Sequence, residues 1–178
     1  MKTKYMRREQ TECFNYAISC IISVYFVYSR IMQKIRKAYM IRLKTNRDIE
    51  SKLLQFCGSS RFLWNKSLAM NLERLEKGQS LLWYQELAWW LTLWKQSDEY
   101  SFLKECPSQV LQQKLRDLER AFNDCFDKKQ PLKHLPVFKK KGRGDGIRFP
   151  QGFKIDNRRI FLPKIDGIIR LNQAHFYP

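Results

Sequence analysis

The segment PSQVLQQKLRDLERAFNDCF (107–126), with LPVFKKKGR (135–143) shortly after it, carries the strongest structural signals in the chain. The apolar residues of its first part recur at steps of three and four, the spacing of one helical face: Leu111, Leu115, Leu118, Phe122, Cys125 and Phe126. Pro107 and Ser108 are residue types favoured where a helix begins. The spacing therefore predicts an amphipathic helix that starts near residue 108.

The other face of this predicted helix is rich in side chains that can donate hydrogen bonds to phosphates or base edges. We take Gln109, Gln112, Arg116 and Arg120 as candidate nucleic-acid contacts. The same face is also compatible with ordinary solvation, in which the two arginines pair with Asp117 or Glu119. The sequence leaves both interpretations open.

The segment that follows is strongly basic. Residues 128–143 contain seven lysines and arginines and no acid. Phe138 directly precedes Lys139, Lys140 and Lys141, and cations of this kind neutralise a phosphate backbone. We add these three lysines and Arg143 to the candidate contacts. The glycines after them do not form a P-loop, because no Gly-Lys-Ser/Thr follows at the required spacing.

The composition of the whole chain favours a polyanionic partner. Its 178 residues include 34 Lys and Arg against 17 Asp and Glu, a formal charge of +17. A nucleic acid offsets the self-repulsion of so basic a protein. The two histidines, His134 and His175, form no metal-binding or catalytic arrangement. We expect no catalytic residue, no metal, no cofactor and no small-molecule substrate.

The five cysteines are odd in number and show no CxxC spacing, so neither a zinc ribbon nor a disulfide framework is indicated. Cys57 and Cys125 fall on apolar helical faces, and we expect them to be buried thiols. A reducing cytoplasm is the predicted location.

Residues 1–31 differ from the rest of the chain. Basic residues precede an apolar run from Cys13 to Tyr28, but no A-x-A cleavage site follows it. The run is also shorter than the roughly 20 residues of a membrane helix. We interpret residues 1–31 as a helical extension upstream of Met32. The disfavoured alternative is a helix that touches a membrane through residues 13–28.

Two helices are predicted after a first strand at KAYMIRL (37–43), with Tyr39 and Ile41 on one face. Thr45 and Asp48 have capping-box spacing, so the first helix should begin near Asn46. We expect Gly58 to interrupt it and a second helix to run from about Ser60 to Lys77, with Gly78 as its C-terminal stop. Two helices separated by such a break are compatible with a helix-turn-helix.

A third helix is predicted from Leu81 to Gln96, and four tryptophans lie in it. Five residues at helical spacing are expected in the core: Trp83, Leu87, Trp90, Leu91 and Trp94. Trp89 is off that stripe. We favour packing for it too, with stacking on a base as the alternative if it is exposed.

The C-terminal part reads as short strands separated by turns: 146–149, 153–155, 159–162 and 168–171. Together with the first strand, they predict an α+β fold in which about four helices are inserted into an antiparallel β unit.

Five segments in this order resemble the N-terminal half of the TnpB (OrfB) proteins of bacterial insertion sequences. They are KAYMIRL (37–43), CGSSRFLWNKSL (57–68), the segment 107–126, LPVFKKKGRGDGIRFPQ (135–151) and IFLPKIDGIIRL (160–171). TnpB proteins are transposon-encoded RNA-guided DNA nucleases, also described as transposases. The resemblance covers about residues 33–171.

The resemblance implies a partial β-barrel, or wedge unit, made from residues 32–45 and 131–178. A helical recognition lobe, residues 46–130, would be inserted in it and begin like a helix-turn-helix. Such proteins bind guide RNA and the RNA–DNA duplex largely through backbone shape and charge. Arg61 and Asn65 match the family's Arg…Asn helix pattern, so both join the candidate contacts. Asp117 matches too, and its role could be to orient Arg116.

Family members also carry a RuvC-like nuclease domain with three metal-binding carboxylates, and a four-cysteine zinc module. Here only Asp156 and Asp166 follow residue 145, both in expected turns. We therefore expect a fragment that binds DNA or guide RNA and is not an enzyme. The alternatives are one half of a split nuclease, whose nuclease half is encoded separately, and an unrelated helix-turn-helix regulator.

Overall fold

The computed structural model describes residues 22–24, 37–39, 41–129, 132–143 and 145–171. Ile22–Val24 (β1) pairs antiparallel with Lys37–Tyr39 (β2). This part of the expected N-terminal extension is therefore a strand instead of a helix, and the rest lies outside the described residues. None of the helices within the described ranges is both long and apolar enough to cross a membrane.

Helix α2, Arg47–Glu76, is a single helix of 30 residues. It begins where the sequence predicted, but Asn46 caps it: its Oδ1 accepts from the Ile49 N–H at 2.8 Å. Thr45 instead donates to Glu50 at 2.7 Å. At the other end Gly78, with φ of 65°, forms a Schellman motif with the carbonyl groups of the last turn, so the predicted stop is confirmed.

The predicted interruption at Gly58 is wrong, because α2 runs through it without a break. A glycine inside a helix costs about 1 kcal/mol relative to alanine. The turns on both sides of Gly58 bury large apolar side chains, including Leu53, Phe56 and Leu63. Burying each such side chain contributes roughly 1.5–3 kcal/mol, so packing outweighs the local preference.

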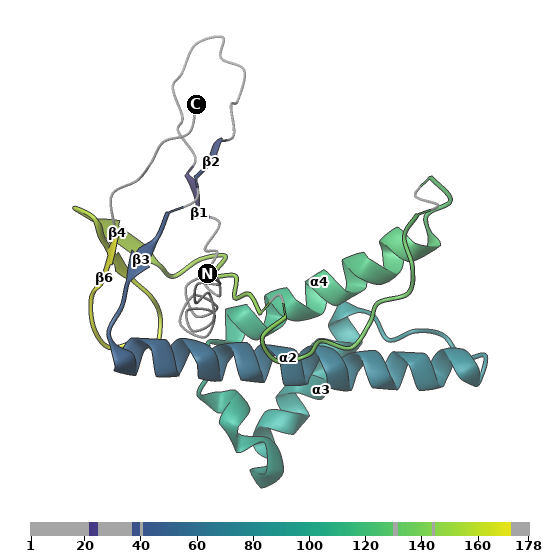
Figure 1. The fold of residues 1–178 in the computed structure, drawn as a ribbon. Helices are drawn as coiled ribbons and strands as arrows, with labels where there is room; N and C mark the ends of the chain where they lie inside the picture. Colours follow the sequence, from purple (N-terminus) through teal and green to yellow (C-terminus); the bar gives the residue numbers. More distant parts are fainter. Residues whose placement is uncertain (1–21, 25–36, 40, 130–131, 144, 172–178) are drawn as a thin grey trace, which may run out of the picture.

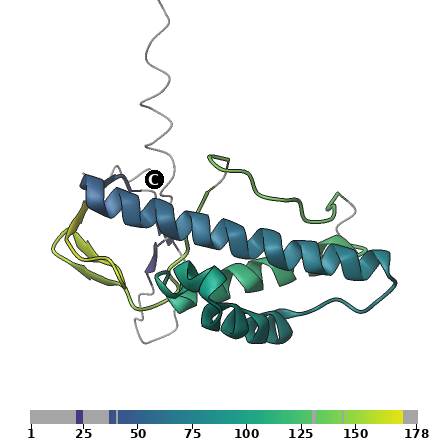
Figure 2. The same ribbon diagram turned by 90° about the horizontal axis from the view of Figure 1, so that it is seen from below.

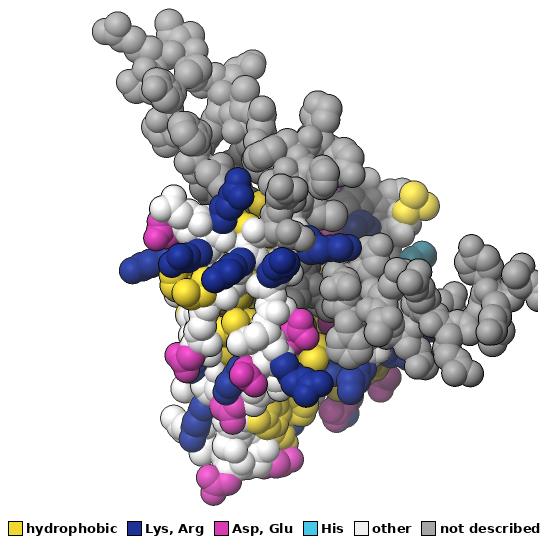
Figure 3. All heavy atoms as spheres, turned by 60° about the vertical axis from the view of Figure 1, so that its left-hand side comes forward, with side chains coloured by type: hydrophobic (Ala, Val, Ile, Leu, Met, Phe, Trp, Pro, Cys, Tyr) yellow, Lys and Arg dark blue, Asp and Glu magenta, His cyan; other side chains and the backbone are white. Residues whose placement is uncertain are grey.

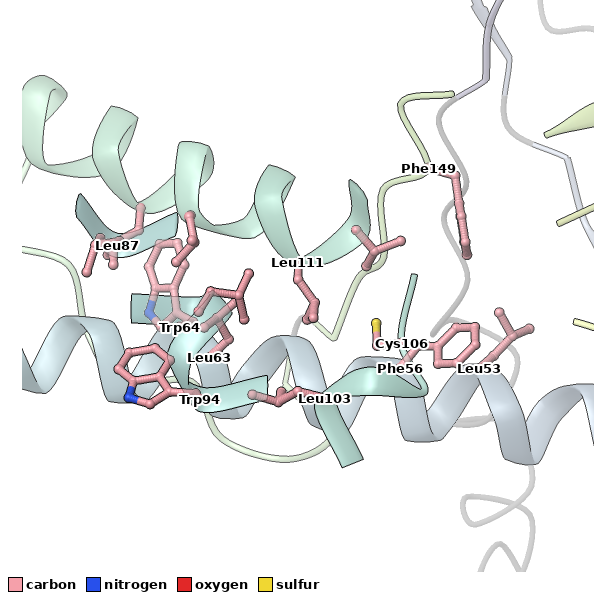
Figure 4. Packing of buried hydrophobic residues seen from close by; sticks show 14 of the residues in the cluster. Leu53, Phe56, Leu63, Trp64, Leu87, Trp94, Leu103, Cys106, Leu111 and Phe149 are labelled. Carbon is pink, nitrogen blue, oxygen red and sulfur yellow. The ribbon is translucent and has the colours of Figure 1, made fainter. Parts of the chain in front are cut away.

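Three further helices pack with α2 into one core. They are α3 (Tyr84–Gln96), the 3-10 helix η2 (Asp98–Lys104) and α4 (Ser108–Phe126). Figure 1 and Figure 2 show α2 as the long axis of the molecule, with α4 lying along it, and α3 packs against α4 and η2. Figure 4 shows side chains of all four helices meeting in this core, and Phe149 entering it from the segment after α4.

The buried face predicted for the helix after Pro107 is confirmed in α4, since Leu111, Leu115, Leu118 and Phe122 are buried. The last turn differs: Cys125 is partly exposed and Phe126 is 53% exposed. These two residues lie on the final turn, beyond the core side chains of the helix. Cys57 is buried as predicted.

The tryptophans of the third predicted helix are only partly in the core. Leu87, Leu91 and Trp94 are buried. Trp83 is 38% exposed because α3 begins only at Tyr84, which makes Trp83 its N-cap. Trp89 is 59% exposed and rests edge-on against Trp90, with ring centroids 5.2 Å apart. The core placement predicted for Trp83 and Trp89 is therefore wrong.

The remaining strands form one open antiparallel sheet in the order β3-β6-β5-β4. Their bounds are Leu43–Lys44 (β3), Lys154–Asp156 (β4), Arg159–Phe161 (β5) and Ile169–Leu171 (β6). The helices are inserted between β3 and β4, so the predicted α+β class is confirmed. The sheet lies where α2 begins (Figure 1), and a Cβ on Gly167 would come within 3.2 Å of Ile49 Cδ1.

Two strand predictions need correction. The predicted strand 37–43 is split, because β2 pairs with β1 whereas β3 pairs with β6. Residues 146–149 form no strand, since Phe149 turns into the helical core instead of alternating along a sheet. The β4–β5 turn has positive φ at both Asn157 and Arg158, which is the geometry of a type I′ hairpin.

Candidate nucleic-acid interface

One face of α2 holds the segment that contains the basic residues. Arg61, Trp64 and Asn65 are spaced i, i+3 and i+4, so their side chains lie on the same side of the helix. Trp64 Nε1 donates to the carbonyl oxygen of Val137 at 3.0 Å. Asn65 binds the backbone of Lys139 twice, donating to its carbonyl at 3.0 Å and accepting from its N–H at 2.8 Å. These bonds fix an irregular segment along the helix.

Asn71 uses the same device further along α2. It is 1% exposed, donates to the Leu82 carbonyl at 3.0 Å and accepts from the Leu82 N–H at 2.8 Å. Glu119 of α4 accepts from the N–H of Tyr84 at 3.1 Å, close to the start of α3. Asn65 and Asn71 thus each hold a separate segment against α2, by binding both the N–H and the carbonyl group of one residue in it.

The carboxylate of Asp145 links α2 to the basic residues that follow Lys139. Its two carboxylate oxygens each accept from Arg61 Nη1 at 2.9 Å, and one also accepts from the N–H of Gly142 at 3.0 Å. The Arg61 and Asp145 side chains are only 20% and 13% exposed. We call residues 140–143 the basic turn. The Asp145 side chain, which follows the basic turn, points inward, whereas Lys140, Lys141 and Arg143 are exposed to solvent.

Lys139 differs from the residues of the basic turn. Its Nζ lies 4.1 Å from the centroid of the Trp64 ring, in cation–π contact. Burial, followed by the charge of Lys114, lowers the pKa of Lys139 to about 8. Its charged form is thus disfavoured relative to an exposed lysine, and its contacts are intramolecular.

The candidate residues of α4 form a separate surface. Gln112, Arg116 and Arg120 are exposed and Gln109 is half-buried. The Arg116 guanidinium stacks over the Tyr84 ring at 4.7 Å.

The pairings considered for the two α4 arginines do not form. Asp117 accepts from Gln113 at 3.0 Å and from Arg148 at 3.3 Å, so it does not orient Arg116. Within the described part of the chain, neither Arg116 nor Arg120 forms an ion pair.

The structure therefore brings Arg61 and Asn65 together with residues 139–143, whereas none of the contacts described above joins the α4 candidates to them. Sequence reasoning missed Trp64 and Asp145, which hold the segment, and Asn71. The i, i+3, i+4 spacing of Arg61, Trp64 and Asn65 was a usable signal for one shared helical face. In the described ranges, no group of three or more His, Cys, Asp or Glu side chains is placed to hold a metal ion.

Comparison with known proteins relates part of this chain to a known type of domain. Residues 32–80 match the helix-turn-helix domain of OrfB proteins of the IS605 type. The match includes all of α2 and ends in the connection to α3. The match assigns residues 32–80 to this type of domain and agrees with the resemblance to TnpB/OrfB proteins that the five segments indicated.

Two relatives support this assignment. A protein of Escherichia coli (strain K12), named as the RNA-guided DNA endonuclease InsQ, is 42% identical over 131 residues, which are 72% of this chain and 32% of that protein. A protein of Streptomyces pristinaespiralis, also named as an RNA-guided DNA endonuclease, is 29% identical over 136 residues, 75% of this chain and 33% of that protein. The chain spans about a third of the length of these curated relatives.

Proposed function

We propose that this chain binds the phosphate backbone of DNA or guide RNA through the basic turn, with the polar face of α4 as a second contact surface. The observation that carries the proposal is the inward position of Asp145. Because Arg61 and the Gly142 N–H bind this carboxylate, the exposed charges of Lys140, Lys141 and Arg143 are left without an acidic partner in the turn. Three adjacent cations on a fixed turn suit contact with successive phosphates.

In this proposal Arg61, Trp64 and Asn65 position the basic turn and do not themselves contact the nucleic acid. Their polar atoms already bind Asp145, Val137 and Lys139. Gln109, Gln112, Arg116 and Arg120 remain candidate contacts on α4, where Arg116 is oriented by the Tyr84 ring.

The activity for which the relatives are named extends the proposal to a role in RNA-guided DNA recognition. The chain would supply binding through backbone shape and charge, and the guide would supply the sequence. Cleavage would be the work of metal-binding carboxylates in a RuvC-like domain, made as a separate partner in the split-nuclease version of the proposal. The family match favours these readings over an unrelated regulator.

The test is a titration of the chain with a fluorescent DNA duplex and with an RNA–DNA duplex between about 50 and 200 mM salt. We expect the logarithm of the binding constant to fall linearly and steeply with the logarithm of salt concentration. Incubation of the same complexes with Mg²⁺ should leave the DNA uncut. Weak binding that does not respond to salt would contradict the proposal.

A further inference from the structure

A row of positive charges crosses the sheet, on a surface distinct from the basic turn. Lys44 of β3 lies opposite Arg170 of β6, and Arg170 lies opposite Arg159 of β5. All three side chains are exposed. Asp156 of the edge strand β4 faces Arg159 and ends the row. Figure 3 shows a line of Lys and Arg side chains on this side of the molecule, with hydrophobic side chains next to it.

The residues that alternate with this row show which face of the sheet points outward. Ile160 lies opposite Ile169, and these side chains are 1% and 0% exposed. Because successive side chains of a strand point to opposite faces, Arg159 and Arg170 share the outer face. We call Lys44, Arg170 and Arg159 the basic row.

Without a bound anion, the basic row lowers the stability of the sheet. Like charges directly opposite each other on neighbouring strands are destabilising. Neighbouring strands are about 4.8 Å apart, so the three cations lie within roughly 10 Å. A nucleic-acid strand carries one negative charge per nucleotide, so a backbone that follows the row brings phosphates next to these cations. A bound phosphate backbone would turn the repulsion into attraction.

A second row on the outer face carries an aromatic ring. Phe161 is two residues from Arg159, lies opposite Lys154 and is 38% exposed. Ile168, 44% exposed, precedes β6 at the position that would face Phe161 if the β5–β6 register continued by one residue. An exposed aromatic ring on a basic antiparallel sheet is a stacking surface for an unpaired base.

We propose that the outer face of the β3-β6-β5-β4 sheet binds single-stranded nucleic acid, with phosphates on the basic row and one base stacked on Phe161. The proposal rests on the proposed function in that the chain handles nucleic acid. It adds a separate site and a preference for unpaired bases. A duplex can contact the basic row but offers Phe161 no free base face.

Binding of a short fluorescent oligothymidine, compared with a duplex, tests the role of Phe161. The full chain carrying Phe161→Leu keeps an apolar side chain at this position but loses the aromatic ring. We expect its affinity for oligothymidine to fall roughly tenfold, with the affinity for duplex unchanged. The variant Phe161→Trp, which keeps an aromatic ring, should bind oligothymidine like the unmodified chain. Equal effects of Phe161→Leu on both probes, or none, would overturn the stacking assignment.

The double variant Arg159→Gln, Arg170→Gln tests the basic row. Losing two phosphate contacts should make the salt dependence of oligothymidine binding shallower by about 1.4 in slope, at about 0.7 per contact. An unchanged affinity and slope would overturn the proposal.

Substitution of the basic turn separates this proposal from the proposed function. If Lys140→Gln, Lys141→Gln, Arg143→Gln weakens binding while the sheet variants bind like the unmodified chain, the sheet site is wrong and the proposed function stands. If no variant changes binding, both are wrong.

Discussion

Replacing Lys140, Lys141 and Arg143 together by glutamine should make duplex binding by this chain far less sensitive to salt. Each phosphate contact contributes about 0.9 to the slope of log affinity against log salt, so three lost contacts remove up to about 2.7. The three side chains are exposed and lie outside the helices, so the circular dichroism spectrum should not change. A fluorescence anisotropy titration at several salt concentrations measures the effect.

A matched control separates the position of these charges from their number. Lys77→Gln, Lys104→Gln, Lys129→Gln lowers the formal charge equally and changes exposed lysines elsewhere on the chain. This control should keep most of the original slope. If both triple variants lose the same amount, binding depends on net charge alone and the basic turn has no special role.

Trp64→Ala should lower the free energy of unfolding by about 3–5 kcal/mol, the largest effect on stability that we expect from a single substitution. Trp64 is only 7% exposed and lies in the hydrophobic core between the helices. Its indole N–H also binds the Val137 carbonyl, and its ring contacts Lys139. The substitution therefore removes core packing together with two contacts to the segment that carries the basic turn. Urea denaturation followed by circular dichroism gives the change.

A second tryptophan, Trp89, serves as the control for Trp64→Ala. Trp89→Ala removes an equally large side chain that is 59% exposed and contacts Trp90 edge-on. Loss of that aromatic contact should cost no more than about 1.5 kcal/mol. Equal destabilisation by the two substitutions would contradict the placement of Trp64 in the core.

The spacing of apolar residues predicted a helix well where all the buried side chains lie on one face of it. Leu111, Leu115 and Leu118 gave α4, and Gly78 gave the end of α2. The same local reasoning failed at Gly58, because core packing on both sides exceeds the helix penalty of one glycine. It also failed for Trp83 and Trp89, whose exposure depends on where α3 begins and on which neighbours cover it.

The sequence identified Arg61 and Asn65 as candidate residues but gave no sign of the hydrogen bonds that they make within the chain. Arg61 and Asn65 were expected to contact nucleic acid, because donors on a helix give no sign of their intramolecular partners. Those partners, Asp145 and Lys139, lie 84 and 74 residues away in sequence. The basic row was equally hidden, since it depends on the pairing of β3 with β6, near opposite ends of the described chain.

The salt dependence of nucleic-acid binding by Asn65→Ala tests most directly the claim that α2 holds the basic turn in place. Asn65 is uncharged, so if it touched the nucleic acid itself, its loss would lower affinity without changing counterion release. If it positions the basic turn through Lys139, its loss should also weaken the phosphate contacts of Lys140, Lys141 and Arg143. We predict a slope for Asn65→Ala that is shallower than that of the unmodified chain and approaches that of the triple variant. A lower affinity with a parallel slope would contradict the claim and make Asn65 a direct contact.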